Sequence, residues 1–464
     1  MREIPPQRMH DHSPETQAIV DLVLDYSRRR VLFEDVPLDK PMSPRDLRRL
    51  APATVTEDGI GAPRALAVFE NVLAPACLSV DHPSYVAFIP SAPSKAAIAF
   101  DLVVSASAVY GGSWLEGSGV VHAENEVLSV LAREFGLPAS AGGCFVQGGT
   151  IGNLSALVAA RHRAKARRAA EGRERPAEWI VVCSEEAHSS VASAAEVMDV
   201  RAIAVPVGDD GRLRGDDVRP VLEEHGDDVF AVVATAGSTN FGIVDDLASI
   251  AELRREFGFW MHVDGAYGLA AALVPERRER FSGLEHADSL IVDPHKWLYA
   301  PFDACALIYR DAEEGRSAHT QKAGYLDPLT DGADWNPSDF GIQLTRRPRG
   351  LPLWFSLATY GLGAYRRAIA ANLETARRIA EEVRRRPWLR LVREPDLSVV
   401  VFERAGWTMA DYSAWSSRLL DEQDAFVTPS SHRGRPVARF AIVNPRTTVE
   451  SLVAILDSMA PAEG

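Results

Sequence analysis

Cysteine, lysine and long apolar runs are all scarce in this chain of 464 residues. The four cysteines lie far apart with no Cys-x-x-Cys pair, so the sequence predicts neither a disulfide framework nor a zinc or other metal site. No stretch approaches the ~18 uninterrupted apolar residues that a membrane span requires. The first thirty residues carry acids and prolines where a secretory signal would have an apolar centre. We therefore expect a cytoplasmic protein that makes no membrane contact.

Positive charge is also in deficit, since the formal net charge is -14. General nucleic-acid binding needs a basic surface, so no nucleic-acid partner is expected. The arginine-rich stretch 161–175 is explained most simply as the solvated face of a helix. A chain of this length usually exceeds what a single core holds, which predicts one large domain and smaller ones.

Three regions differ in their patterns. Residues 1–80 carry helical patterns, with Ser13 and Pro14 as a helix start, and predict an N-terminal helical arm. In residues 81–365, long helices alternate with seven short apolar runs such as "WIVVCS" and "VFAVVATAG". This pattern predicts a large α/β domain around a mostly parallel seven-stranded sheet. Residues 366–464 alternate strand and helix and predict a small α+β C-terminal domain.

One lysine lies in apolar sequence, in "IVDPHKWLYAP" (residues 291–301). The chain has five lysines against forty-five arginines, so Lys296 needs a reason that arginine would not supply. A lysine amine can lose its proton and become a nucleophile, whereas a guanidinium keeps its charge. Burial and neighbouring positive charge would ease that loss. A lysine by itself is more often a surface residue, so Lys296 is judged together with its surroundings.

A glycine-bearing turn links a predicted strand to a helix in "VQGGTIGNLSALVAAR" (146–161). Gly148 and Gly149 let backbone N–H groups approach an anion, and the helix N-terminus with the hydroxyl of Thr150 favours a phosphate there. The turn fits neither the dinucleotide nor the Walker pattern, so a turn without a ligand is the alternative.

Two further polar residues follow predicted strands. Asp264, in "HVDGAYG", could cap a helix, bind a metal beside His262 or pair with a protonated ring nitrogen. His188, just beyond "WIVVCS", could be structural or could stack on a ring. In open α/β sheets, ligands bind at the carboxyl ends of the strands. A phosphate site, a carboxylate, an imidazole and a lysine that meet there are what pyridoxal phosphate needs, because a lysine amine holds this aldehyde and a carboxylate tunes its ring nitrogen.

These stretches carry a family resemblance that extends over most of the chain. The matching segments are "HPSYVAFIPSAPS" (82–94), "GGTIGNLSAL" (148–157), "AHSS" (187–190), "ATAGSTNFGIVDDL" (234–247), "HVDGAYG" (262–268), "ADSLIVDPHKWLYAP" (287–301) and "IQLTRRPRGLPLWFSLATYG" (342–361). In them the chain resembles the group II pyridoxal phosphate-dependent amino acid decarboxylases, which include aromatic L-amino acid, histidine and glutamate decarboxylases. The resemblance implies fold type I of the pyridoxal phosphate enzymes and a homodimer whose active sites lie at the subunit interface.

The resemblance also assigns roles to individual residues. Lys296 would form the Schiff base with the cofactor, Asp264 would bind the pyridine nitrogen, and His188 and Ala266 would lie on the two faces of the ring. The other cofactor-binding residues, near the phosphate or at a strand end, would be Gly149, Thr150, Asp293, His295 and Thr235. The substrate pocket would be lined by Ser91 and Trp114, with the ring of Tyr85 as a further candidate.

The implied activity is decarboxylation of an L-amino acid, with an aromatic or apolar rather than an acidic side chain, to an amine and carbon dioxide. In typical family members a tyrosine on a mobile loop returns a proton to the product, but residues 326–350 contain no tyrosine. Pro337 lies near the expected position, with Trp335 and Phe340 close by, and Tyr325 lies too early.

Several alternatives follow from that missing tyrosine. The surrounding segment, 311–345, lacks periodicity and is expected to be a functional loop or disordered. His188 could supply the proton instead. Alternatively, as in relatives with phenylalanine at the tyrosine position, oxygen could react and give an aldehyde, ammonia and carbon dioxide. A transaminase or another lyase reaction on the same fold is a third possibility.

Overall fold

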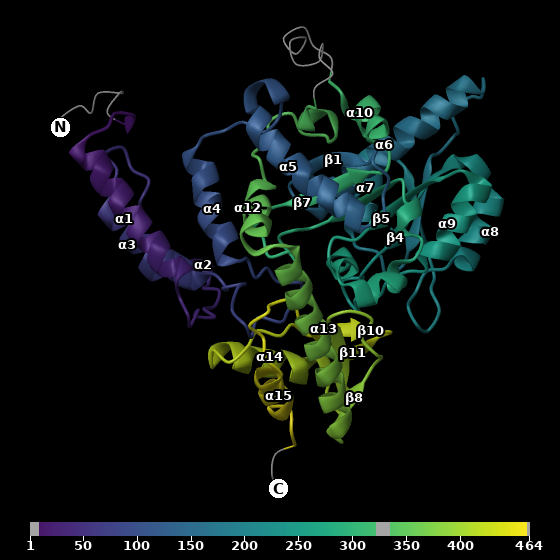
Figure 1. Ribbon diagram of the computed structural model, residues 1–464. Coiled ribbons are helices and arrows are strands. Elements are labelled where there is room, and N and C mark those ends of the chain that lie inside the picture. The colour runs from purple at the N-terminus through teal and green to yellow at the C-terminus, as the bar shows by residue number, and fades with distance from the viewer. Residues whose placement is uncertain (1–8, 322–334, 462–464) are drawn as a thin grey trace.

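A seven-stranded sheet lies at the centre of the computed structural model, which describes residues 9–321 and 335–461 (Figure 1). The strands run in the order β1-β7-β6-β5-β4-β2-β3. β7 pairs antiparallel with both of its neighbours, and the remaining pairs are parallel. The expected α/β fold with a mostly parallel seven-stranded sheet is therefore confirmed. The strands are β1 (Gly142–Val146), β2 (Ile180–Ser184), β3 (Arg201–Val205), β4 (Val229–Thr235), β5 (Trp260–Asp264), β6 (Ser289–Val292) and β7 (Cys305–Tyr309).

Helices cover both faces of this sheet, which explains why most of its strands are unbroken apolar runs. Along β4, Val232 packs into an apolar cluster on one face, while Ala231 and Val233 pack into a second cluster on the other. The helices around the sheet are α5 (Trp114–Glu134), α6 (Gly149–Ala170), α7 (Ser190–Met198), α8 (Gly215–His225), α9 (Leu247–Phe257), α10 (Ala312–His319) and α12 (Leu351–Tyr360). Short helical turns join these elements: η4 (Gly226–Asp228), η5 (Gly268–Leu273), η6 (Pro275–Phe281), η7 (Leu284–His286) and η9 (Pro337–Asp339).

The N-terminal helices lie apart from the sheet (Figure 1). They are α1 (Pro14–Val31), α2 (Pro44–Leu50), α3 (Ala62–Val68), η2 (Phe69–Leu73), η3 (Ala74–Ala76) and α4 (Lys95–Ala106). The expected helix start is present, because the side chain of Ser13 accepts a hydrogen bond from the backbone of Thr16 and Pro14 opens the helix. α1 has no buried residue, and Val20 and Leu24 on it are 45% and 53% exposed. This part of the chain therefore presents apolar side chains to its surroundings.

A second, antiparallel sheet follows α13 (Leu362–Arg385), the helix that leaves the region of the large sheet (Figure 1). It has the order β10-β11-β9-β8 and its own apolar cluster, which includes Phe402, Phe440 and Trp415. Its elements are β8 (Leu389–Leu391), β9 (Val399–Arg404), α14 (Met409–Asp421), β10 (Ser430–His432), β11 (Arg435–Ala441) and α15 (Val449–Asp457). The small C-terminal sheet agrees with the expected fold class. The domain boundaries at 80/81 and 365/366 remain a proposal, and the second falls inside α13.

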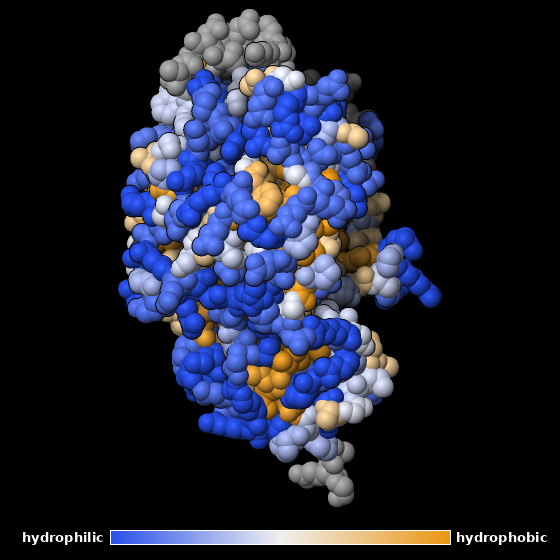
Figure 2. Space-filling view, turned by 90° about the vertical axis from the view of Figure 1, so that its right-hand side faces the viewer, coloured by the Kyte–Doolittle hydropathy of each residue, from blue (hydrophilic) through white to orange (hydrophobic). Residues whose placement is uncertain are grey.

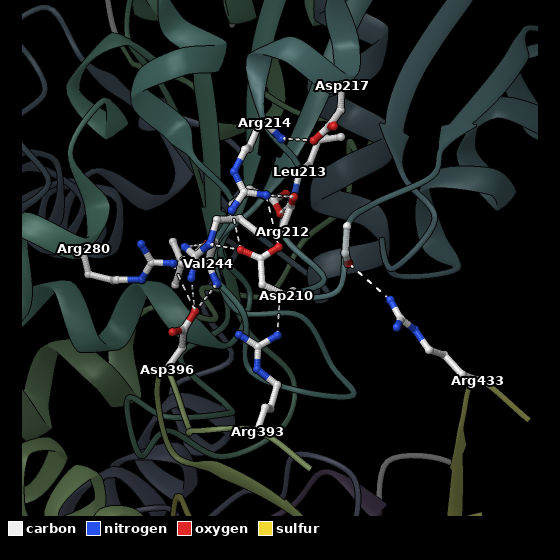
Figure 3. Close-up of polar contacts among 12 residues, drawn as sticks. Asp210, Arg212, Leu213, Arg214, Asp217, Val244, Arg280, Arg393, Asp396 and Arg433 are labelled. Atoms are coloured by element: carbon white, nitrogen blue, oxygen red, sulfur yellow. Dashed lines mark hydrogen bonds and ion pairs between the residues drawn. The ribbon is translucent and has the colours of Figure 1, made fainter. Parts of the chain in front are cut away.

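Ion pairs join the segment before β9 to the region of the large sheet. The carboxylate of Asp396 accepts hydrogen bonds from Arg212 at 2.8 Å and from Arg280 at 3.1 Å, and both guanidinium groups also donate to the carbonyl of Val244. Arg393 donates to the backbone carbonyl of Asp210. Figure 3 shows Asp396 facing Arg212 and Arg280 from below, with Arg393 beneath Asp210. These contacts join the small sheet to the loop between β3 and α8, to the loop after β4 and to η6.

The segment 311–345 contains more regular structure than its sequence predicts. Residues 312–319 form α10, whose start is capped by the side chain of Asp311. Farther along, Trp335 stacks on Phe340 with ring centroids 4.3 Å apart and donates to the carbonyl of Gly143. Tyr325, the tyrosine placed too early in the loop, lies outside the described residues.

A buried ion pair anchors the chain just after this segment. Arg346 and Glu124 each have 2% exposed side chains and are joined by hydrogen bonds of 2.7 and 3.0 Å. Glu124 also accepts a hydrogen bond from the backbone of Gly350. The two terminal nitrogens of Arg346 also donate to the backbone carbonyls of Gly111 and Phe145, so further hydrogen bonds support the buried pair.

Hydrophilic residues predominate on the face of the molecule that Figure 2 shows. Apolar residues gather there in a patch in the lower half, at the level of the small sheet. Within residues 9–321 and 335–461, no helix combines the length and the hydrophobicity needed to cross a bilayer.

Candidate active site

A cavity of about 320 Å³ opens at the carboxyl ends of the parallel strands. In open α/β sheets this is the edge where ligands bind. Thr235 and Asp264 end neighbouring strands as register partners, and the loops that follow β1, β2 and β6 complete the wall. The expected cofactor-binding residues all line this cavity: Gly149, Thr150, His188, Thr235, Asp264, Ala266, Asp293, His295 and Lys296. The structure thus brings together residues that lie up to about 150 positions apart in the chain.

The start of α6 forms the part of the cavity suited to an anion. Gly148 precedes the helix with φ of 123°, a conformation that favours glycine, and no side chain caps the helix. A Cβ on Gly149 would lie 3.1 Å from the carboxylate of Asp293 and 3.4 Å from the Cβ of Ala266. Glycine is therefore favoured at position 148 by the backbone conformation, and at position 149 by the close approach of Asp293 and Ala266. The first N–H groups of the helix lack intrahelical partners and favour a phosphate.

Two buried polar atoms in the wall have unused hydrogen-bonding capacity. Among the described residues, neither the hydroxyl of Thr235 nor one carboxylate oxygen of Asp293 has a hydrogen-bond partner. Buried polar groups are rarely left unpaired without a functional reason. Together with the open helix start, these atoms fit a polar, phosphorylated cofactor in this cavity.

The carboxylate of Asp264 is held from both sides. One oxygen accepts a hydrogen bond of 2.8 Å from the amide of Asn153, and the other accepts from the backbone of Ala266 at 3.2 Å. Asp264 lines the cavity and is 6% exposed. The metal alternative for Asp264 is not supported, because both ring nitrogens of His262 are engaged by Ser289 and Asn153.

The amine of Lys296 lies 3.0 Å from a carboxylate oxygen of Asp293. Burial alone would lower the pKa of Lys296, but the charges of Asp293 and Asp264 outweigh it and raise the pKa above its ordinary value. The charged groups nearest to the amine are therefore acids, which oppose the loss of its proton, whereas burial favours that loss. The two carboxylates therefore keep the Lys296 amine protonated. Asp293 accepts a hydrogen bond from the amine and can take the proton that the amine must lose.

The two histidines of the site are fixed through their Nδ1 atoms. Nδ1 of His188 lies 2.8 Å from the hydroxyl of Ser190 and accepts a hydrogen bond from the backbone N–H of Ser190. Nδ1 of His295 lies 2.7 Å from the carbonyl oxygen of Ala304. In His188, the Nε2 atom remains for the cavity that the ring lines.

The three substrate candidates do not line the cavity around Lys296. Ser91 donates to the carbonyl of Ala300 and lines a second cavity of about 480 Å³, which shares Phe302 with the first. The ring of Tyr85 is buried against another aromatic ring, and the backbone N–H of Trp114 donates to the side chain of Asn336. Their role in substrate binding stays a prediction.

Several residues around the cavity were missed by the sequence reasoning. Asn153 and Ser190 lie in its wall and contact Asp264 and His188. Arg439, on β11, is 6% exposed and donates to the carbonyl of Thr239, another residue of the wall. Burial lowers the pKa of Arg439 to about 10. A single arginine inside the apolar run "VARFAIV" was the signal that could have identified it.

Comparisons with known proteins agree with this geometry. A family model described as the pyridoxal-dependent decarboxylase conserved domain matches residues 44–405. An aromatic-L-amino-acid decarboxylase of Bacillus atrophaeus is 27% identical over 456 residues, covering 94% of this chain and 92% of the relative. A 4-hydroxyphenylacetaldehyde synthase of Rhodiola rosea is 26% identical over 392 residues, covering 82% of this chain and 78% of the relative. A crystal structure of Oryza sativa TDC with PLP and tryptamine superposes with a TM-score of 0.86 at 25% identity and covers 99% of both chains.

Proposed function

Because this chain belongs to the group II family of pyridoxal phosphate-dependent amino acid decarboxylases, we propose that it decarboxylates an L-amino acid with an aromatic or apolar side chain. The products are the amine and carbon dioxide. The observation that carries the proposal is the meeting of the Lys296 amine, the Asp264 carboxylate and the open start of α6 in one cavity.

Each part of the cavity has a task in this proposal. When bound, pyridoxal phosphate supplies an aldehyde that condenses with amines and a pyridinium ring that withdraws electrons from a breaking bond. Lys296 would be the amine that holds the aldehyde, and Asp264 would keep a proton on the ring nitrogen. Backbone N–H groups at Gly149 and Thr150 would bind the phosphate. His188 and Ala266 would hold the ring between them.

The charges of the wall support an aromatic or apolar substrate side chain over an acidic one. Asp264, Asp293 and Asp303 line the cavity, and the described part of its wall contains no arginine. A second carboxylate on the substrate would meet repulsion there. The ring of Phe302 is 57% exposed and offers an apolar surface at the edge of the cavity. The names of the Bacillus atrophaeus and Oryza sativa proteins support the same substrate class.

A second candidate function is decarboxylation with oxidation, which gives an aldehyde, ammonia and carbon dioxide. It is favoured by the absence of tyrosine from residues 326–350 and by the similarity to the Rhodiola rosea synthase. Pro337, near the expected position of the tyrosine, lies in η9, and the neighbouring rings of Trp335 and Phe340 stack on each other. None of these side chains can donate a proton from oxygen.

Product analysis separates the two candidates. The twenty amino acids are screened for release of carbon dioxide by the cofactor-loaded protein, and the best substrate is then assayed with and without oxygen. The proposal predicts one amine for each carbon dioxide in both atmospheres. Aldehyde and hydrogen peroxide that form only with oxygen would establish the second candidate instead. Consumption of a 2-oxo acid without carbon dioxide release would exclude both.

We also propose that the protein is a homodimer with shared active sites. Apolar side chains are exposed along α1 and α4, and those of Ile19, Val23, Leu102 and Val103 are 42–48% exposed. A soluble monomer rarely exposes a large apolar face, and a second copy would bury these side chains.

We propose a cytoplasmic location because the cysteines form no disulfide among the described residues. All four are free, and Cys144, Cys183 and Cys305 are buried. Proteins of oxidising compartments more often use cysteines in disulfides. Fractionation of cells that express a tagged chain tests this location.

A further inference from the structure

A chain of buried hydrogen bonds leads from the interior of the sheet to Asp264. The indole N–H of Trp260 donates to the hydroxyl of Ser289 at 2.7 Å, and that oxygen lies 2.8 Å from Nδ1 of His262. Nε2 of His262 lies 2.8 Å from the amide oxygen of Asn153. The amide nitrogen of Asn153 donates to Asp264 at 2.8 Å and to the hydroxyl of Ser190 at 2.9 Å.

Elementary donor and acceptor rules fix the direction of this chain. A carboxylate can only accept, so the nitrogen of the Asn153 amide must face Asp264 and its oxygen must face His262. Nε2 of His262 therefore carries the proton, and Nδ1 accepts from the hydroxyl of Ser289. At the other end an indole can only donate, so the hydroxyl of Ser289 accepts from Trp260 and keeps its own proton for His262.

The members of this chain are almost completely buried. His262 is 0% exposed, and Asn153 and Ser289 are each 1% exposed. Burial lowers the pKa of His262 to about 4, so the ring is neutral at physiological pH, as the tautomer requires. The orientation of the Asn153 amide is therefore set by its protein partners, with Asp264 and Ser190 on its nitrogen and His262 on its oxygen.

We propose that Asn153 and His262 are positioning residues that hold the Asp264 carboxylate toward the ring nitrogen of the bound cofactor. The proposal rests on the role of Asp264 in the proposed function. Asn153 acts through its amide hydrogen, and His262 acts by preventing that amide from turning over. The same amide also donates to the hydroxyl of Ser190, and that hydroxyl contacts His188.

The test compares two ligands that differ only at the ring nitrogen. Dissociation constants are measured by tryptophan fluorescence for pyridoxal phosphate and for its 1-deaza analogue, in which carbon replaces that nitrogen. A hydrogen bond to a charged group corresponds to a preference of about tenfold or more for pyridoxal phosphate in the wild-type protein. Variants Asn153→Ala and His262→Leu are expected to reduce this preference at least fivefold. His262→Gln, which can donate from the position of Nε2, is expected to keep it within twofold.

Asn372→Ala is the matched control. Asn372 is also 1% exposed and also makes three hydrogen bonds, to Trp297, Tyr299 and the backbone of Asn444. It should lower thermal stability as Asn153→Ala does and leave the ligand preference unchanged. An unchanged preference in Asn153→Ala, or an equal loss in Asn372→Ala, would overturn the proposal.

A second measurement needs no cofactor. In protein labelled with ¹⁵N-histidine, the nitrogen shifts of His262, assigned with His262→Gln, should show a neutral ring with its proton on Nε2. A proton on Nδ1 would overturn the proposed orientation. A wild-type protein with that tautomer but without any preference between the two ligands would instead refute the role of Asp264 in the proposed function, and the positioning role with it.

Discussion

Residues of one type differ sharply in their environment in this protein, and histidine shows the effect best. His188 lines the active-site cavity, whereas His319 is 7% exposed at the end of α10. Nε2 of His319 contacts the carbonyl of Ser155 at 3.0 Å and the hydroxyl of Tyr309 at 3.3 Å. Burial lowers the pKa of His319 to about 4. A proton on this ring is therefore disfavoured in the folded protein.

The lowered pKa of His319 predicts a loss of stability in acid. The unfolded chain takes up this proton near pH 6.5 and the folded protein near pH 4, so stability is fully present above about pH 6.5 and is lost as the pH falls between these values. The loss attributable to His319 is about 3 kcal/mol at most. His319→Gln keeps a donor for Ser155 and does not titrate. Urea unfolding from pH 7.5 to 4.5 should show a smaller decline for the variant, and an identical decline would contradict the assignment.

At the scale of elements, ion pairs add to the apolar packing that joins the small sheet to the large-sheet region, in which Val399, Val401 and Val437 take part. The side chain of Asp396 is 18% exposed and forms ion pairs with Arg212 and Arg280. The side chain of Arg212 is 13% exposed. Arg433 pairs with Asp209 in the same region, but Asp209 is 96% exposed. Water screens an exposed pair, whereas removal of Asp396 takes a carboxylate from two guanidinium groups that are partly shielded from water.

This difference gives a paired prediction. Asp396→Ala should lower the free energy of unfolding by about 2 kcal/mol, because two charge-assisted hydrogen bonds are lost in a largely buried place. Asp209→Ala should leave it unchanged within error. Chemical denaturation of both variants measures the difference, and equal effects would contradict this account of how the sheets are joined.

Elements with strong periodicity could be predicted from the sequence, and those decided by tertiary contacts could not. The strand that ends at Asp264 and the helix that begins at Gly149 were both predicted, because apolar runs and glycine turns are local signals. α10 was missed, since its eight residues carry only a short helical pattern and gain stability by packing on α6. Asp264 and Asp293 were expected in the same site as Lys296, but the direct contact between Asp293 and the amine was not predicted. Asp293 is close in sequence, but its contact with the amine depends on the turn between them.

At the scale of the whole molecule, the N-terminal helices extend from one side and leave apolar side chains uncovered (Figure 1). A dimer that buries this face predicts a mass near twice 50.6 kDa by light scattering. The double variant Val20→Glu and Leu24→Glu should give monomers and lose activity, since the active sites are expected to be shared. Val197→Glu, at a 72% exposed valine of α7, is the control and should stay dimeric. A wild-type monomer with full activity would refute the shared site.

The central claim is that the amine of Lys296 holds the cofactor covalently. Treatment of the cofactor-loaded protein with sodium borohydride, followed by digestion and mass spectrometry, identifies the lysine to which the cofactor was joined. The account predicts a phosphopyridoxyl group on the peptide that contains Lys296, and no such label in Lys296→Ala. A label on Lys95 or Lys165, or an unlabelled chain that still releases carbon dioxide, would contradict it.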